Sequence, residues 1–243
     1  MSLNWAQIWM QINDIPAIWL AVTLAAFAVS DAIHIRAYNF PLLHPVLISV
    51  LMIIALLNLT GVSYQTYFDG AYPIHLLLGP ATVALAVPLY ANLQRIRDYI
   101  GPLLIALGVG SVVGIFAGLL IGHLLGLSPL SLISIAPKSV TTPIAMALAQ
   151  HAGGNVSLAA GVVILTGICG AILATPLFQL LRIKDEVAQG FAMGMGAHGV
   201  GTSRAIQMSE TTGAFAGLAM GLNGILTSLI LPLMLSIWFY FFS

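Results

Sequence analysis

Residues 156–180 read VSLAAGVVILTGICGAILATPLFQL, a run that contains no Asp, Glu, Lys or Arg. A helix needs about 20 apolar residues to cross the hydrocarbon core of a bilayer, so this run is long enough to span it. Comparable apolar runs recur along the chain, and they lack the alternation that is typical of an outer-membrane barrel. The stretch therefore predicts an all-α membrane protein.

The composition of the whole chain supports the same class. Of the 243 residues, 60% are hydrophobic and only 6% are charged, whereas soluble domains carry roughly 25% charged residues. So few charges cannot cover a soluble globule, and we expect an integral membrane protein that forms a single domain over residues 1–243. The formal net charge is zero, which gives no electrostatic reason to expect nucleic acid as a partner.

The N-terminus carries no sign of a cleavable signal peptide. Its sequence, MSLNWAQIWMQIND, has neither a basic region nor an A-x-A-like cleavage site. Trp5, Ile8, Trp9 and Ile12 instead share one helical face, which is typical of a helix that lies in the membrane interface.

Six apolar stretches predict spanning helices. They lie near residues 16–35, 42–61, 73–93, 102–126, 156–180 and 214–240. Two further stretches, 129–151 and 187–210, are interrupted at their centres, one by two prolines and the other by a set of glycines: Pro137, Pro143, Gly194, Gly196, Gly199 and Gly201. Such breaks expose backbone groups at membrane depth, where only protein or water can satisfy them, so both stretches are expected to face a cavity.

Positive charges indicate how the two interrupted stretches are oriented. Short loops rich in Lys and Arg tend to stay cytoplasmic, which places three sets of cations inside: Arg36, the Arg95/Arg97 pair and the Arg182/Lys184 pair. The loop at 62–72 then lies outside. All three sets of cations lie inside if 129–151 re-enters the membrane from the outer face and 187–210 re-enters from the cytoplasm. The two stretches would then form an inverted repeat whose tips meet near the midplane. The other arrangement has both stretches as discontinuous helices that cross the membrane.

The first interrupted stretch contains APKSVTTPIA, residues 136–145, which places a cation and three hydroxyls between two prolines. A charge at membrane depth is costly and usually faces a pathway or a partner. The hydroxyls stand beside a helix that would begin near the second proline, and the free amides of a helix N-terminus attract anions. These groups predict a carboxylate site formed by Lys138, Ser139, Thr141 and Thr142. A lysine that snorkels to the interface, and hydroxyls that only pack between helices, remain open interpretations.

The second interrupted stretch contains AHGVGTSRAI, residues 197–206, with small polar groups and a cation in the same order. Gly199 and Gly201 permit an unwound backbone with positive φ, so that amides can turn towards a ligand. Thr202 and Ser203 are expected in the N-cap region of the half-helix that follows. The second stretch is therefore expected to supply the other side of the carboxylate site.

Two ionisable residues in this stretch have two interpretations each. His198 belongs to the side-chain type that titrates near neutrality, so it is either a proton carrier or a hydrogen-bonded structural group. Arg204 presents a planar fork suited to a carboxylate, or it pairs with Glu210 or Asp185. Both residues are retained as candidates for the substrate site.

Nothing in the sequence indicates an enzyme. No Cys/His spacing suggests zinc, no P-loop suggests a nucleotide, and no Ser/His/Asp set can be argued. The lone Cys169 can form no intrachain disulfide. We therefore expect no catalytic residues, no cofactor and no metal.

Three longer motifs carry a resemblance to a known family. They are APKSVTTPIAMALAQHAGG, VILTGICGAIL and GFAMGMGAHGVGTSRAIQMSETTGAFAGLAMGLNGILT. They are similar to the LrgB/CidB family, with the strongest agreement from about Leu77 to Pro232. Members of this family are described as holin-like or antiholin-like regulators of murein hydrolase activity in bacteria. The plastidial glycolate/glycerate translocator resembles a fusion of an LrgA-like and an LrgB-like half, and LrgAB-type pairs are associated with pyruvate uptake.

The resemblance implies two functions, and both remain open. As a transporter, the protein would move small monocarboxylates such as glycolate, glycerate or pyruvate across the bacterial inner membrane, with a proton as a candidate coupling ion. As a holin-like protein, it would perturb the membrane and modulate murein hydrolase activity and autolysis without a substrate site. A separate LrgA-like membrane protein is a candidate partner, and a homo-oligomer is expected. We favour transport, because a pore or scaffold gives no reason for paired helix breaks with cations.

Overall fold

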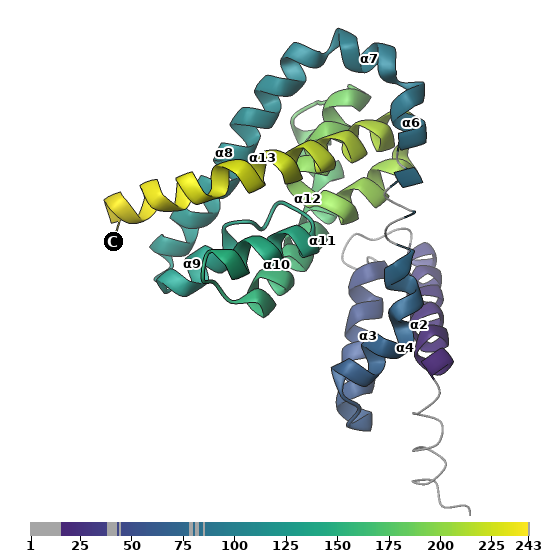
Figure 1. Cartoon of the computed structure of the whole chain (residues 1–243). Coiled ribbons are helices and arrows are strands. Elements are labelled where there is room, and N and C mark those ends of the chain that lie inside the picture. Colours follow the sequence, from purple (N-terminus) through teal and green to yellow (C-terminus); the bar gives the residue numbers. More distant parts are fainter. Residues whose placement is uncertain are drawn as a thin grey trace, which may run out of the picture. The chain divides into compact units, whose positions relative to one another are not determined.

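The computed structural model describes residues 16–37, 43, 45–77, 80, 83–84 and 86–242, and all regular structure in these ranges is helical. The expected N-terminal interfacial helix lies outside the described residues. The chain divides into two compact units, residues 1–84 and 85–243. Each unit is built from its own set of packed helices (Figure 1).

The first unit contains α2 (Pro16–Arg36), α3 (Pro45–Thr60) and α4 (Tyr64–Leu76). α2 packs against both of the other helices. The buried Trp19 of α2 meets Tyr67 of α4 edge to face, with ring centroids 5.9 Å apart. Thr23 adds a hydrogen bond of 3.0 Å to the Tyr67 hydroxyl. Aromatic packing therefore holds α4 against the first predicted span.

α4 corrects two expectations about this unit. The loop expected at 62–72 is mostly helical, because Ser63 caps a helix that starts at Tyr64. The span expected at 73–93 does not begin where predicted, since α4 runs into this range and ends at Leu76. α3, with 16 residues, is shorter than the roughly 20 residues that a spanning helix needs.

The second unit contains the remaining helices: α6 (Ala86–Ala91), α7 (Leu93–Asp98), α8 (Ile100–Leu124), α9 (Pro129–Ile135), α10 (Thr142–His151), α11 (Val156–Leu180), α12 (Glu186–Met208) and α13 (Glu210–Phe242). α11 has the bounds predicted for it, because Asn155 caps its first turn by accepting a hydrogen bond from the amide of Leu158. α13 is 33 residues long and packs against α6, α8, α10 and α12. It therefore contacts both interrupted stretches.

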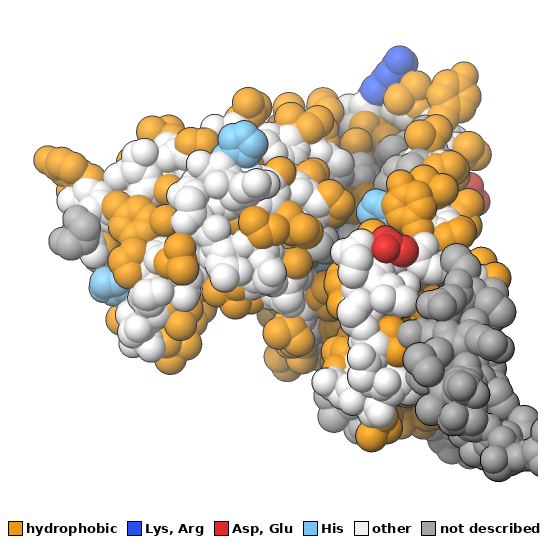
Figure 2. Space-filling model, turned by 60° about the horizontal axis from the view of Figure 1, so that its bottom comes forward, with side chains coloured by type: hydrophobic (Ala, Val, Ile, Leu, Met, Phe, Trp, Pro, Cys, Tyr) orange, Lys and Arg blue, Asp and Glu red, His pale blue; other side chains and the backbone are white. Residues whose placement is uncertain are grey.

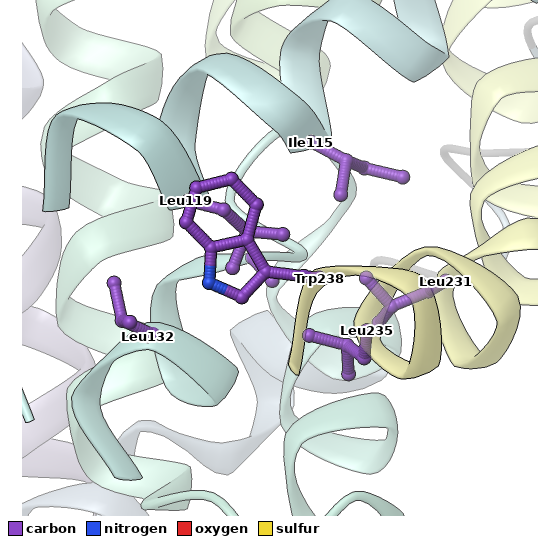
Figure 3. Close-up of a cluster of buried hydrophobic side chains, with 7 residues drawn as sticks. Ile115, Leu119, Leu132, Leu231, Leu235 and Trp238 are labelled. Carbon is purple, nitrogen blue, oxygen red and sulfur yellow. The ribbon is translucent and has the colours of Figure 1, made fainter. Parts of the chain in front are cut away.

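A hydrophobic cluster joins three helices at one end of this unit. Buried side chains of α8, α9 and α13 form one cluster with Trp238 (Figure 3), namely those of Ile115, Leu119, Leu132, Leu231 and Leu235. Burying side chains of this size stabilises a fold by about 1.5–3 kcal/mol each in water. In lipid that driving force is absent, so close packing takes its place.

The surface of the protein is suited to lipid. Four helices among the described residues are long and apolar enough to cross a membrane: α2, α8, α11 and α13. Large apolar side chains of these helices point outwards, and Figure 2 shows hydrophobic side chains spread over the visible face, with few charges between them. Many exposed apolar side chains on helices of this length are suited to contact with a membrane. The chain is a helical membrane protein.

Candidate functional site

The first break lies between α9 and α10, over residues 136–141. α9 ends at Ile135, and a turn follows in which the amide of Lys138 donates to the carbonyl of Ile135 over 3.1 Å. α10 starts at Thr142, with Pro143 in its first turn. A proline nitrogen cannot donate a helical hydrogen bond, so it is accommodated at a helix start. The interruption predicted for this stretch is present.

The hydroxyls predicted for this site stand at the start of α10. Thr141 is its N-cap in an extended conformation, and its hydroxyl makes no capping hydrogen bond. The side chains of Ser139, Thr141 and Thr142 are all half-buried. The amides of the first turn carry the positive end of the helix dipole. The start of α10 therefore offers amides and hydroxyls to a negatively charged group.

Lys138 projects from this break onto α8. Its Nζ donates a hydrogen bond to the carbonyl of Gly114, which lies near the middle of that helix. Gly118, one turn after Gly114 on α8, leaves room for the ammonium, because a Cβ added at Gly118 would lie 2.6 Å from the Lys138 Nζ. Within the described ranges, the polar partner of the ammonium is this backbone carbonyl and not a carboxylate. The charge is therefore directed into the helix bundle.

The second break lies within α12, at His198. This residue has φ 39° and ψ −129°, whereas the residues on both sides are helical. A Cβ added at Gly201 would lie 2.5 Å from the carbonyl oxygen of Met193. Residues eight positions apart in a straight helix are separated by about 12 Å along its axis. The second half of α12 therefore folds back beside the end of the first half.

His198 is held in this conformation by two hydrogen bonds. Its ring Nε2 lies 2.9 Å from the carbonyl oxygen of Val163 on α11, and its own carbonyl accepts from the hydroxyl of Thr202 over 2.8 Å. The ring fits because α11 has a glycine beside it, since a Cβ added at Gly167 would lie 2.6 Å from Cε1. The backbone conformation is sparsely populated for a residue with a side chain, and such conformations persist where the surroundings hold them and cluster at functional sites. This geometry agrees with the interpretation of His198 as a hydrogen-bonded structural group.

The glycines of α12 have a different role from the one predicted. Positive φ was expected at Gly199 and Gly201, but the break uses His198. Gly190 and Gly194 instead let α12 approach α13 closely, because a Cβ at either position would collide with a backbone carbonyl, that of Thr212 or Ala216. Missing side chains at regular intervals allow close packing of membrane helices. These two glycines therefore serve helix contact.

Asn223 of α13 connects the two breaks. Its side chain is 1% exposed, and its Nδ2 donates to the carbonyl of Ser139 over 2.9 Å and towards that of Met195 over 3.4 Å. Its Oδ1 accepts from the hydroxyls of Ser111 on α8, over 2.7 Å, and Thr227, over 3.3 Å. Sequence reasoning missed Asn223. The available signal was a single amide side chain in the apolar run GLAMGLNGILT.

The structure brings only some of the predicted residues together. Lys138 and Ser139 lie at the junction of α8, α13 and the first break, and Met195 joins the second break to the same junction. Thr202 is buried, but it lies four residues into the second half-helix, so the N-cap expected there is wrong. Ser203 is exposed.

Arg204 and Gly199 lie away from these contacts. The Arg204 guanidinium donates to the side chain of Gln207 over 3.1 Å, and neither Glu210 nor Asp185 is its partner. Gly199 has open space around the position of a Cβ. Within the part of the chain that the structure describes, no group of three His, Cys, Asp or Glu side chains is arranged to hold a metal ion.

Comparison with known proteins places the chain in a family. The model of the LrgB-like family matches residues 23–237. The chain belongs to the LrgB-like family. The match extends over both compact units and includes both breaks. No solved structure matches the chain.

Relatives of this family member cover nearly the whole chain. A protein of Bacillus subtilis, YxaC, described as uncharacterized, is 36% identical over 95% of this chain and 99% of its own length. The holin-like protein CidB of Staphylococcus epidermidis is 29% identical over 90% of this chain and 96% of its own length. The predicted resemblance to the LrgB/CidB family is therefore confirmed.

Proposed function

We propose that this LrgB-like protein carries small monocarboxylates across the membrane through a site between its two breaks. The observation that supports the proposal is the position of Lys138. Its ammonium contacts a backbone carbonyl near the middle of α8, a helix long enough to span. A lysine that snorkels would extend towards a helix end. Intramembrane charges that face the bundle interior usually mark a substrate or ion pathway.

The groups around the ammonium suit a carboxylate of small size. The charge of Lys138 has a carbonyl as its described partner, so a carboxylate can form a stronger, charge-assisted hydrogen bond with it. The uncapped start of α10 and the hydroxyls of Thr141 and Thr142 offer donors nearby in the sequence. A 2-hydroxy or 2-oxo group would use those donors. This substrate class includes glycolate, glycerate and pyruvate.

Lys138→Met tests the binding role, because methionine keeps much of the side-chain length without the charge. A charge-assisted hydrogen bond to a buried group contributes about 1.5–3 kcal/mol, so we expect the Kd for glycolate or pyruvate to rise roughly ten- to a hundredfold. The measurement is equilibrium binding of labelled substrate to purified protein. Lys184→Met is the matched control, since Lys184 is exposed in the loop after α11 and should bind normally. Unchanged binding by Lys138→Met would assign that lysine a structural role.

We propose further that the two interrupted stretches are hairpins that enter from opposite faces of the membrane. The fold-back of α12 at His198 supports this arrangement. In a Cys169→Ala background, we expect His151→Cys to react with an impermeant thiol reagent outside the cell, and Lys184→Cys to react only after permeabilisation. The opposite pattern would show that the first stretch crosses the membrane.

A holin-like action is the second candidate function. It is favoured by the names of the CidB relatives, which are called holin-like proteins. In that case the protein acts on the membrane as an oligomer and modulates murein hydrolase activity, and Lys138 serves packing. A separate LrgA-like partner is compatible with either candidate. Substrate-selective binding that depends on Lys138 distinguishes transport from this action.

A further inference from the structure

Asn223 is a buried amide side chain in the second unit, and it makes hydrogen bonds with three other segments and with its own helix. The side chains of Ser111 and Thr227 donate to its oxygen, and its nitrogen donates to carbonyls of Ser139 and Met195. A side-chain amide offers two donors and one oxygen with two lone pairs, and all four positions are used here. Such a fully connected buried group fixes the arrangement of its neighbours.

The two carbonyls that Asn223 contacts lie at points where helical hydrogen bonding is interrupted. The carbonyl of Ser139 belongs to the turn between α9 and α10. The carbonyl of Met195 would pair in a continuous helix with the amide of residue 199, which lies beyond the bend at His198. One planar amide therefore joins the backbones of both breaks. It holds Ser139 more tightly than Met195, at 2.9 Å against 3.4 Å.

We infer that Asn223 is a positioning residue that couples the two breaks, so that displacement of one backbone segment is transmitted to the other. The rigid amide cannot follow one carbonyl without altering its distance to the other. Its oxygen is anchored meanwhile to α8 through Ser111 and to its own helix through Thr227. As a part of the transport cycle, this coupling rests on the proposed function. As a mechanical link, it is a property of the fold alone.

The test displaces one break and observes the other. Gly167→Ala places a methyl group against the ring of His198 and so disturbs the second break from α11. Ser139→Cys reports on the first break through its rate of reaction with a small thiol reagent, in a Cys169→Ala background. Coupled residues differ from additivity by about 0.5–3 kcal/mol, so Gly167→Ala should change this rate about twofold or more. The same comparison is then made in an Asn223→Leu background, in which leucine keeps the branched shape of the side chain and removes the amide.

In the Asn223→Leu background, Gly167→Ala should leave the Ser139→Cys rate unchanged. Gly161→Ala, on the same helix but with open space around the added methyl, is the control for the disturbance. Asn58→Leu is the control for losing an asparagine, since Asn58 donates to Ile54 within α3. If Asn223→Leu does not fold, Asn223→Ala replaces it, because alanine adds no volume.

Two results would overturn the inference. One is an equal change in the Ser139→Cys rate on Gly167→Ala with and without the Asn223 amide, which would show that other contacts couple the two breaks. The other is no response in either background, which would show that the breaks are independent. Because the labelling is done without substrate, the coupling can be established even if no carboxylate binds. Loss of carboxylate binding would count against the proposed function alone.

Discussion

The two breaks match in sequence order but differ in construction. The first is a short non-helical connection between α9 and α10, with a proline at the start of α10 and a lysine directed onto α8. The second is a bend at one residue, His198, between two helical halves of α12, and its cation, Arg204, pairs with Gln207. The first break therefore presents a charge, whereas the second presents close backbone packing.

This difference shows that a repeated order of residue types does not require a repeated site. Both motifs place a small polar residue beside a cation, yet Lys138 contacts the interior of the bundle and Arg204 contacts its own helix. Under the proposed function, charge recognition therefore belongs to the first break. The second break supplies backbone to the junction through Met195 and Asn223.

The largest loss of stability is expected when a methyl group is added at the close contact between α12, which contains the second break, and α13. In Gly194→Ala, the added methyl would collide with the backbone carbonyl of Ala216, and a backbone cannot move aside as a side-chain tip can. Overpacking of this kind costs about 1–3 kcal/mol or more, so we expect less folded protein and a lower Tm in detergent. Gly196→Ala is the matched control on the same helix, since its methyl meets open space. Equal Tm values for the two variants would contradict the packing role.

At the first break, we expect weaker binding of a monocarboxylate and little loss of stability. In Gly118→Ala, the methyl group would meet the flexible end of Lys138, so the ammonium shifts while the fold persists. Weakening one charge-assisted hydrogen bond should raise the Kd for a monocarboxylate by about tenfold, with little change in Tm. Gly108→Ala, on the same helix with open space, should bind normally. A Tm loss as large as that of Gly194→Ala would show that both breaks serve packing.

Local signals in the sequence predicted much of the fold. α11 has its predicted bounds because a long apolar run follows an asparagine that caps it. Pro137 and Pro143 predicted the first break because proline lacks a donor. α4 was missed because its cap, Ser63, precedes a polar and aromatic segment that resembles a loop in composition.

The candidate site was predicted less completely, because its contacts join distant segments. The partners of Asn223 include residues 111, 139 and 195, and no local pattern relates them. Glycine preference indicated the wrong residue for the bend in α12, since hydrogen bonds with Val163 and Thr202 hold His198 in a conformation that glycine adopts more easily. Lys138 became a candidate because a lone charge in an apolar stretch is visible in the sequence itself.

The most direct test of the central claim is uptake of labelled glycolate and pyruvate into liposomes that contain only this protein, compared with Lys138→Met. An entrapped dye of unrelated size is followed in the same vesicles. The account predicts carboxylate uptake that saturates, retention of the dye, and loss of uptake in Lys138→Met with the fold preserved. Release of the dye together with unselective flux, equal in both proteins, would contradict the transport site and establish the holin-like action instead.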